Sequence, residues 1–288
     1  MNFKLTLSLL LCASLMACSK DEPKPSPTPD PEPQPEPVPE EAPYTPGTPI
    51  FEDQFETFNS ANWTKETHAA GWVNNELQSY SPDQVTVGKD GDKTVLVIKA
   101  TRKGDTFVSG RINSKGKIKF GEGTLEASIR MPKTENGLWP AFWMMGDNSK
   151  NWPACGEIDI VEMGNADGIK ARTSERHVNS AIHYGASADA HQQDWFADNF
   201  GKSLQDGKYH TYTLRRSADK LEVLIDLVPF HTFDIKGNEF FQGDFYVLFN
   251  LAVGGDFTGI LDYSKITALT SNGQSAAMYI DWIRIFDK

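Results

Sequence analysis

Residues 50–288 are predicted to form an all-β sandwich, on the basis of three observations. Short runs in which apolar and polar residues alternate recur along this part of the chain, as expected for strands whose side chains point to opposite faces in turn. Gly, Asp, Asn and Lys separate the runs, and no long segment has the 3.6-residue period of a helix. A length of roughly 240 residues suits one large sandwich. The predicted strands lie within residues 94–100, 123–130, 209–214, 220–226, 245–251 and 278–285.

The charge balance and the cysteine count exclude several classes of function. The chain has 28 basic and 39 acidic residues, a net charge of −11. Nucleic-acid-binding domains present basic surfaces, and anionic membranes repel an acidic one, so neither is an expected partner. Once the signal and Cys18 are set aside, Cys155 alone remains, and we interpret it as a packed thiol without a disulfide. No His/Cys cluster suggests zinc, and a monomer is the default expectation.

The first 18 residues are predicted to be a lipoprotein signal. The apolar run Leu5–Ala17 follows Lys4 and is too short for a membrane-spanning helix, which indicates a secretory signal. It ends in Leu15-Met16-Ala17-Cys18, which resembles a bacterial lipobox, so Cys18 is the predicted lipidation site; an ordinary cleaved signal is the alternative. The next residues, Ser19–Glu22, resemble the acidic sorting signal of surface-exposed lipoproteins in Bacteroidetes. The predicted location is therefore the cell envelope, at the surface of the outer membrane.

Residues 19–49 are predicted to be an extended linker. Twelve of the 17 prolines of the chain lie in this segment. Proline lacks an N–H and has a fixed φ, so the segment favours a polyproline-like spacer over a helix or a sheet. Such a spacer suits a domain, residues 50–288, that is held away from a membrane by a lipid. A peptide ligand for a partner domain is the alternative.

The segment Gly156–Gly164 carries the strongest chemical signal. Glu157 and Asp159 alternate with isoleucines as in a strand, so both acids share one face. Glu162 lies five positions after Glu157, and regular alternation would send it to the opposite face. A β-bulge at Ile160-Val161 adds one residue and returns Glu162 to the face of Glu157. We therefore predict a bulge and three carboxyls on one side of the strand.

Two carboxyls on one face are the requirement of a retaining glycosidase. One must be ionised to attack an anomeric carbon, and the other must carry a proton for the leaving oxygen. Three neighbouring acids repel one another, which raises the pKa of at least one of them. A solvated outer face and a calcium site are the alternatives for this motif taken alone.

Three tryptophans close to this strand indicate a sugar-binding surface. Trp139 and Trp143 precede the acidic segment, and Trp152 leads into it. Indole rings stack on the apolar CH faces of pyranose rings, so tryptophans beside an acidic strand suit a carbohydrate site. The alternative is that these side chains fill the core of the sandwich.

The sequence resembles glycoside hydrolase family sixteen, and within it the laminarinase-like endo-β-glucanases. The matching segments are Trp72–Gln78, Ser109–Ile112, Phe120–Ala127, Trp139–Met145, Gly156–Met163, Ile182–Gly185, Phe249–Gly255 and Ile280–Arg284. The resemblance covers most of residues 51–286. It implies a concanavalin-like β-jelly-roll sandwich with a concave carbohydrate-binding cleft.

The resemblance also implies a mechanism and roles for the three acids. The family hydrolyses internal glycosidic bonds by retaining double displacement. Carried over to this sequence, Glu157 is the nucleophile, Asp159 assists it, and Glu162 is the general acid and then the general base. No cofactor is expected for catalysis. The form with Val161 inserted is more similar to laminarinases, agarases and carrageenases than to the lichenases with a shorter motif.

Further residues are implied at the substrate and metal sites. The implied substrate-binding residues are Trp139, Trp143, Trp152, Asn74, Arg111 and His183. Trp139 and Trp143 are implied to flank the subsites next to the cleaved bond, and a structural role for His183 is the alternative. Many members of the family bind one structural calcium ion, for which the implied ligands are Glu52, the Gly91 carbonyl and Asp281. Oxygen ligands of this kind suit calcium, although Asp281 equally suits a cap or a salt bridge.

The predicted function is an endo-β-glucanase acting on β-1,3 or mixed-linkage β-1,3/1,4 glucan. Two segments depart from the laminarinase pattern: Asp256-Phe257-Thr258-Gly259 replaces Asn-Trp-Pro-Gly, and Ala166–Ser180 is rich in charge. Both leave the linkage preference open. The alternatives are an agarase-like β-galactanase of the same family and a non-catalytic glycan-binding lipoprotein. Sulfated galactan is disfavoured, because residues 50–288 carry a net charge of −7.

Overall fold

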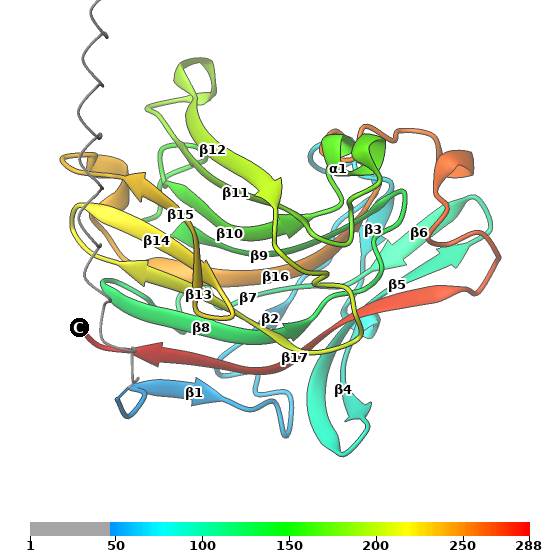
Figure 1. The fold of residues 1–288 in the computed structure, drawn as a ribbon, viewed down its shortest axis with the longest axis horizontal. Helices are drawn as coiled ribbons and strands as arrows, with labels where there is room; N and C mark the ends of the chain where they lie inside the picture. Colours follow the sequence, from blue (N-terminus) through cyan, green and yellow to red (C-terminus); the bar gives the residue numbers. More distant parts are fainter. Residues whose placement is uncertain (1–46) are drawn as a thin grey trace, which may run out of the picture. The chain divides into compact units, whose positions relative to one another are not determined.

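A computed structural model describes residues 47–288, so the predicted signal, Cys18 and most of the predicted linker lie outside the described residues. Two sheets stack face to face (Figure 1). The larger sheet has ten strands in the order β15-β14-β13-β8-β17-β5-β6-β3, with β1 beside β17 and β4 beside β5. Its strands are β1 (Phe51–Asp53), β3 (Gln78–Tyr80), β4 (Val85–Asp90), β5 (Lys93–Lys103), β6 (Thr106–Ser109), β8 (Gly123–Arg130), β13 (His210–Arg216), β14 (Lys220–Ile225), β15 (Val228–Asp234) and β17 (Ser275–Phe286).

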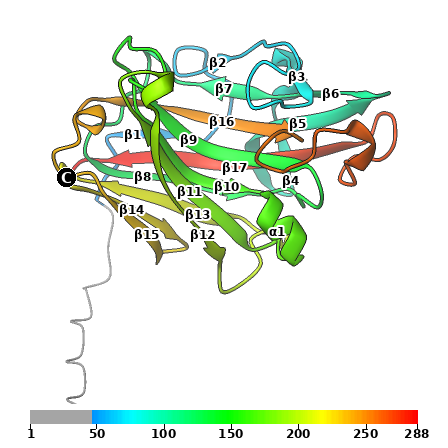
Figure 2. The same cartoon turned by 90° about the horizontal axis from the view of Figure 1, so that it is seen from above.

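The smaller sheet has seven strands in the order β12-β11-β10-β9-β16-β7-β2, and Figure 2 shows it from above. Its strands are β2 (Thr64–Lys65), β7 (Arg111–Asn113), β9 (Leu138–Gly146), β10 (Glu157–Met163), β11 (His177–Tyr184), β12 (Gln192–Asn199) and β16 (Phe245–Val253). All six strand-like runs predicted from the sequence fall within or overlap observed strands, and the all-β sandwich is confirmed.

The core lies between the two sheets and is built from the inward-facing apolar residues of the alternating runs. Phe142 of β9 and Phe249 of β16 stack there with ring centroids 4.8 Å apart, and both are fully buried. Ile158 and Ile160 of β10 are also fully buried. Burying an apolar side chain of this size contributes about 1.5–3 kcal/mol, which fixes the face that each strand turns toward the core. The opposite face of the seven-stranded sheet is called the outer face below.

The segment that departs from the family pattern after β10 forms a short helix. Helix α1 (Ala166–Ala171) begins at Asn165, whose side chain accepts a hydrogen bond from the Gly168 N–H, as an N-cap does. It ends at Arg172 in the left-handed conformation. Four short 3₁₀ turns complete the described elements: Pro82–Gln84, Ala188–Ala190, Glu239–Phe241 and Tyr263–Lys265. Within residues 47–288, no helix is both long and apolar enough to cross a membrane.

Candidate active site

Strand β10 contains the predicted bulge. Its pairing with β9 places Asp159 opposite Trp143 but Val161 opposite Phe142, so Ile160 is the extra residue. The pairing with β11 shifts over the same interval. A single extra residue in one strand reverses the alternation of side chains beyond it. The bulge predicted at Ile160-Val161 is therefore confirmed.

The bulge brings the three acids to the outer face. Glu157, Asp159 and Glu162 pair with Met145, Trp143 and Ala141 of β9, respectively. These three partners are two residues apart along β9 and so share one face. Directly opposed residues of antiparallel strands also lie on one face, so the carboxyls do as well. Asp159 and Glu162 are buried, whereas Glu157 keeps part of its surface exposed.

Glu162 is held by two hydrogen-bond donors. Trp139 Nε1 donates to Oε1 of Glu162 over 2.9 Å, and Asn179 Nδ2 donates to Oε2 over 2.7 Å. Burial, together with the charge of Asp159, raises the pKa of Glu162 to about 8 against these bonds, which lower it. The raised pKa favours the protonated form of Glu162, which a general acid requires.

Glu157 and Asp159 both lie close to a histidine, His183. Ligand atoms of Glu157, Asp159 and His183 lie within 4.8 Å of one another, and His183 Nε2 is 3.3 Å from Oδ2 of Asp159. Burial raises the pKa of both carboxyls, and the charge of Asp159 raises that of Glu157 further. Because the two carboxyls lie this close together, ionisation of one disfavours ionisation of the other. The arrangement can keep one carboxylate charged while its neighbour carries a proton.

A second histidine, which the sequence analysis missed, contacts this cluster. His191 Nε2 lies 3.0 Å from His183 Nδ1, and the two rings stack with centroids 5.2 Å apart. Trp152 lies beside them, 42% exposed, with its ring centroid 4.8 Å from that of His191. His191 therefore fixes the orientation of the ring that faces Asp159. No spacing signal in the sequence pointed to it, because it enters from the loop that follows β11.

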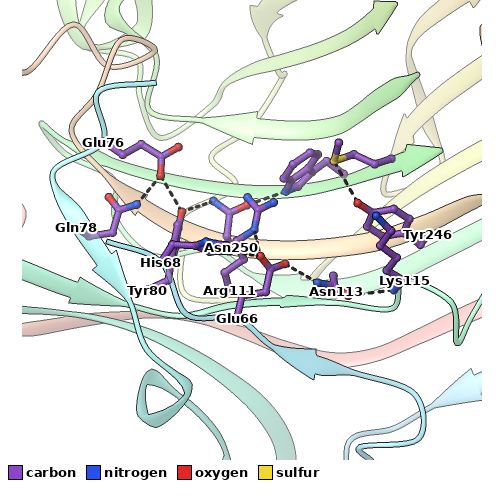
Figure 3. Close-up of polar contacts among 12 residues, drawn as sticks. Glu66, His68, Glu76, Gln78, Tyr80, Arg111, Asn113, Lys115, Tyr246 and Asn250 are labelled. Carbon is purple, nitrogen blue, oxygen red and sulfur yellow. Dashed lines mark hydrogen bonds and ion pairs between the residues drawn. The ribbon is translucent and has the colours of Figure 1, made fainter. Parts of the chain in front are cut away.

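Arg111 of β7 lies in the same row of the seven-stranded sheet as Glu162, with Asn250 and Ala141 between them, and Figure 3 shows its polar contacts. Its Nε donates to Oε2 of Glu66 over 3.0 Å. Its guanidinium carbon lies 4.7 Å from the ring centroid of Trp143 and 5.2 Å from that of Trp72. Trp143 Nε1 in turn donates to Oδ1 of Asn250 over 2.7 Å. Arg111 thus orders two tryptophan rings in addition to presenting its remaining donors.

The predicted residue Asn74 lies further from the acids, in the exposed loop that precedes β3. Its side chain lies 3.4 Å from Oε1 of Glu76, a long hydrogen bond. Glu76 also accepts from Gln78 and from the Tyr80 hydroxyl, at 2.5 and 3.0 Å (Figure 3). Tyr80 connects this group to Asn250, whose Nδ2 donates to its hydroxyl over 3.2 Å. The structure therefore links Asn74 to the outer face through a chain of polar contacts.

The departing loop after β16 contacts the residue that holds Glu162. Phe257 stacks on Trp139 with ring centroids 4.6 Å apart and an interplanar angle of 17°. The loop is fixed on two sides, because the Asp256 N–H donates to the Asn74 carbonyl and the Ala166 N–H donates to the Phe257 carbonyl. One face of Trp139 is therefore covered by a phenyl ring of the chain itself.

Two of the three residues implied as calcium ligands form ion pairs with cationic side chains. Glu52 Oε1 lies 2.6 Å from Nε of Arg284, and Asp281 Oδ2 lies 2.6 Å from Nζ of Lys93. Gly91 lies in the turn between β4 and β5 with a φ of 59°. A dication at these ligands would have to displace an ammonium and a guanidinium group. As placed, Glu52 and Asp281 are paired with cations and do not fit a calcium ion, and the ligand set implied by the resemblance is left to experiment.

Calcium is therefore expected to leave the melting temperature unchanged, because the ion pair between Lys93 and Asp281 already neutralises the carboxylate. Thermal unfolding in calcium and in chelator measures this. An increase in the melting temperature with calcium that disappears in Asp281→Asn would show that the ligand set implied by the family resemblance is correct.

The two-layer sandwich and the clustered carboxyls of β10 define a glycosidase of the jelly-roll class. The sequence pattern of glycosyl hydrolases family 16 matches residues 73–284, and the chain belongs to that family. A Bacteroides ovatus structure, described as a mixed linkage glucan GH16 in complex with a G4G4G3G product, is 58% identical, with a TM-score of 0.81 over 82% of this chain and 100% of that chain. The laminarinase of Flavobacterium sp. UMI-01 is 26% identical, with a TM-score of 0.68 over 83% and 100%.

A curated relative agrees with these structures. The glucan endo-1,3-beta-glucosidase of Cryptopygus antarcticus is 32% identical over 230 residues, which cover 73% of this chain and 81% of the relative. The jelly-roll sandwich implied by the sequence resemblance is confirmed by these matches.

Proposed function

We propose that this protein is a retaining endo-β-glucanase that cleaves internal bonds of mixed-linkage β-1,3/1,4 glucan, with β-1,3 glucan as a related substrate. The observation that carries the proposal is the bulge at Ile160, which places Glu157 and Glu162 on one face of β10. Their backbones are then about four regular steps, or ~13 Å, apart. Two side chains that lean toward each other close this distance to the ~5–5.5 Å carboxyl separation of a retaining glycosidase.

In the first step the Glu157 carboxylate attacks the anomeric carbon. The bond from Glu157 to that carbon forms as the bond to the glycosidic oxygen breaks, and Glu162 gives its proton to the departing oxygen. The raised pKa of Glu162 supplies that proton near neutral pH. Asp159, which contacts His183, influences the pKa of the Glu157 carboxyl through its own charge.

In the second step water releases the sugar. Glu162, now a carboxylate, takes a proton from water while the water oxygen attacks the anomeric carbon and displaces Glu157. One water is consumed for each bond broken, and two inversions at the same carbon leave its configuration retained. All the groups that these steps require belong to β10.

The choice of mixed-linkage glucan is supported by the Bacteroides ovatus match, which is more than twice as similar in sequence as the laminarinase. Incubation with barley β-glucan, lichenan, laminarin and agarose, with products resolved by chromatography and by NMR of the new anomeric centre, tests it. We expect the fastest release of β-configured oligosaccharides from the two mixed-linkage substrates. Cleavage of agarose alone would favour the galactanase alternative, and no cleavage of any glucan would overturn the proposal.

We also propose that the enzyme is a surface lipoprotein of the outer membrane. The lipobox-like segment ending at Cys18 and the proline-rich linker support this. Incorporation of radiolabelled palmitate should be abolished in Cys18→Ser, and protease added to intact cells should remove the catalytic domain of the unaltered protein. A secreted, unlabelled protein would contradict the proposal.

A further inference from the structure

The edge of the seven-stranded sheet beyond the catalytic strand presents a tryptophan that no role above accounts for. In β11, Ala181 pairs with Asp159 on one side and with Trp195 of β12 on the other. Because directly opposed residues of antiparallel strands lie on the same face, Trp195 shares the outer face with the catalytic carboxyls. Figure 1 shows β12 beside β11 at this edge of the sheet.

The neighbouring residue fixes the direction in which Trp195 points. Phe196 stacks on His231 of β15 with centroids 4.4 Å apart, and meets Phe230 edge-on at 5.2 Å. These contacts tie β12 to the opposite sheet through its inward face. Successive side chains of a strand alternate, so Trp195 is directed outward. Its side chain is 56% exposed, although an indole of this size favours burial.

The residue that lies between Asp159 and Trp195 across the strands has a small side chain. Ala181 is the one residue that separates them in this register, and its side chain is a methyl group. Neighbouring strands are about 4.8 Å apart, so the backbone of Trp195 lies roughly 10 Å from that of Asp159, measured across the strands. A short oligosaccharide spans this distance. The adjacent row pairs Asn179 with Ala197, which is also small. A sugar chain that crosses β11 at Ala181 therefore meets only a methyl group at that position, with the His183 ring beside it, 3.3 Å from Asp159.

The same row continues on the other side of the acids with further aromatic rings. Asp159 pairs with Trp143, and Arg111 lies between the rings of Trp143 and Trp72. Aromatic rings therefore lie on both sides of Asp159 in this row, Trp195 on β12 and Trp143 on β9. The net negative charge of residues 50–288 disfavours a polyanion, so a neutral chain is the expected occupant.

We infer that Trp195 is an outlying glucan-binding subsite, which stacks on a pyranose ring of a neutral β-glucan chain that crosses Ala181 from the catalytic carboxyls. The inference rests on the proposed endo-β-glucanase function. It predicts that longer oligosaccharides gain affinity from a contact that short ones do not reach. The gain expected from one aromatic stack is about tenfold in the dissociation constant.

Calorimetric binding of mixed-linkage gluco-oligosaccharides of increasing length tests this inference. The binding protein is the Glu157→Gln variant, which does not consume the ligand, with and without Trp195→Ala. We expect Trp195→Ala to weaken the longer oligosaccharides by about tenfold and to leave the shortest one unchanged. Trp195→Phe should restore most of the loss. Tyr263→Ala, which removes an aromatic ring 39% exposed on a 3₁₀ turn elsewhere, is the matched control.

The outcomes separate the two proposals. Suppose that Glu157→Gln binds the oligosaccharides and that adding Trp195→Ala leaves the increase in affinity with oligosaccharide length unchanged. Trp195 is then not a subsite, whereas the glucanase proposal stands. If no gluco-oligosaccharide of any length binds, both fail together. A uniform loss at every length, accompanied by a changed circular dichroism spectrum, would also count against the subsite, and Trp195→Phe then reports whether the ring itself matters.

Discussion

Glu157→Gln is expected to lower kcat/KM on β-glucan by about 10⁴-fold or more, since an amide cannot form the glycosyl-enzyme. Glu157 is the acid of β10 that keeps part of its surface exposed, as an attacking group requires. The measurement is initial-rate hydrolysis of barley β-glucan, combined with mass spectrometry of the protein after reaction with a 2-fluoro aryl glucoside. The unaltered enzyme should gain a sugar on the peptide that contains Glu157, and the variant should gain none.

The matched control is Glu126→Gln. Glu126 is also a buried carboxyl with a raised pKa, caused by burial, but it lies on β8 of the ten-stranded sheet. Its replacement should leave kcat/KM within about twofold, because surface and scaffold substitutions of this kind act on stability. Full activity in Glu157→Gln would show that another group is the nucleophile.

Replacing Glu162 with glutamine should separate the two halves of the reaction. We expect hydrolysis of glucan to fall by about 10²–10⁴-fold, the contribution of a general acid and base. A dinitrophenyl glycoside, whose leaving group needs no proton, should still form the glycosyl-enzyme at close to the normal rate. Azide, which attacks without a general base, should then restore turnover and yield a glycosyl azide of retained configuration. Equal losses on both substrates would contradict this role.

The pH dependence follows from the same side chain. The pKa of Glu162 is raised to about 8, so the acid form that glycosylation needs is present below that pH and is lost as the pH rises through it. The rate on glucan should therefore fall on the alkaline side with a midpoint set by Glu162. With the dinitrophenyl glycoside, whose leaving group needs no proton, formation of the glycosyl-enzyme by the unaltered protein should show no such alkaline decrease.

Much of the fold was readable from the sequence, because the strands carry clean alternation and the turns carry Gly, Asp and Asn. The bulge was readable for the same reason. Regular alternation would place Glu162 on the face opposite to that of Glu157 and Asp159, and one extra residue in the strand returns it to their face. Arguments of this kind use neighbours along one strand, so they reach no further than β10 itself.

The partners of the acids were not readable in the same way. Asn179 lies four positions before His183 on β11, so alternation would have placed both on one face, but nothing in the sequence shows which strand lies beside β10. His191 and Phe257 come from loops, where no period applies. Glu52 pairs with Arg284, and Asp281 pairs with Lys93, and the two members of each pair are far apart in the sequence. The sequence shows the oxygen ligands but not the cations that lie beside them in the fold.

The extra residue at Ile160 has a consequence for how such enzymes diverge. Without it the strand would read Glu-Ile-Asp-Val-Glu, in which ordinary alternation already turns all three acids the same way. Whether Glu157 and Glu162 share a face therefore depends on the alternation of side chains along the strand and not on a fixed number of residues between them. Loss of one codon here, with the flanking strands sliding by one position, would therefore still leave the three acids on one face of the strand.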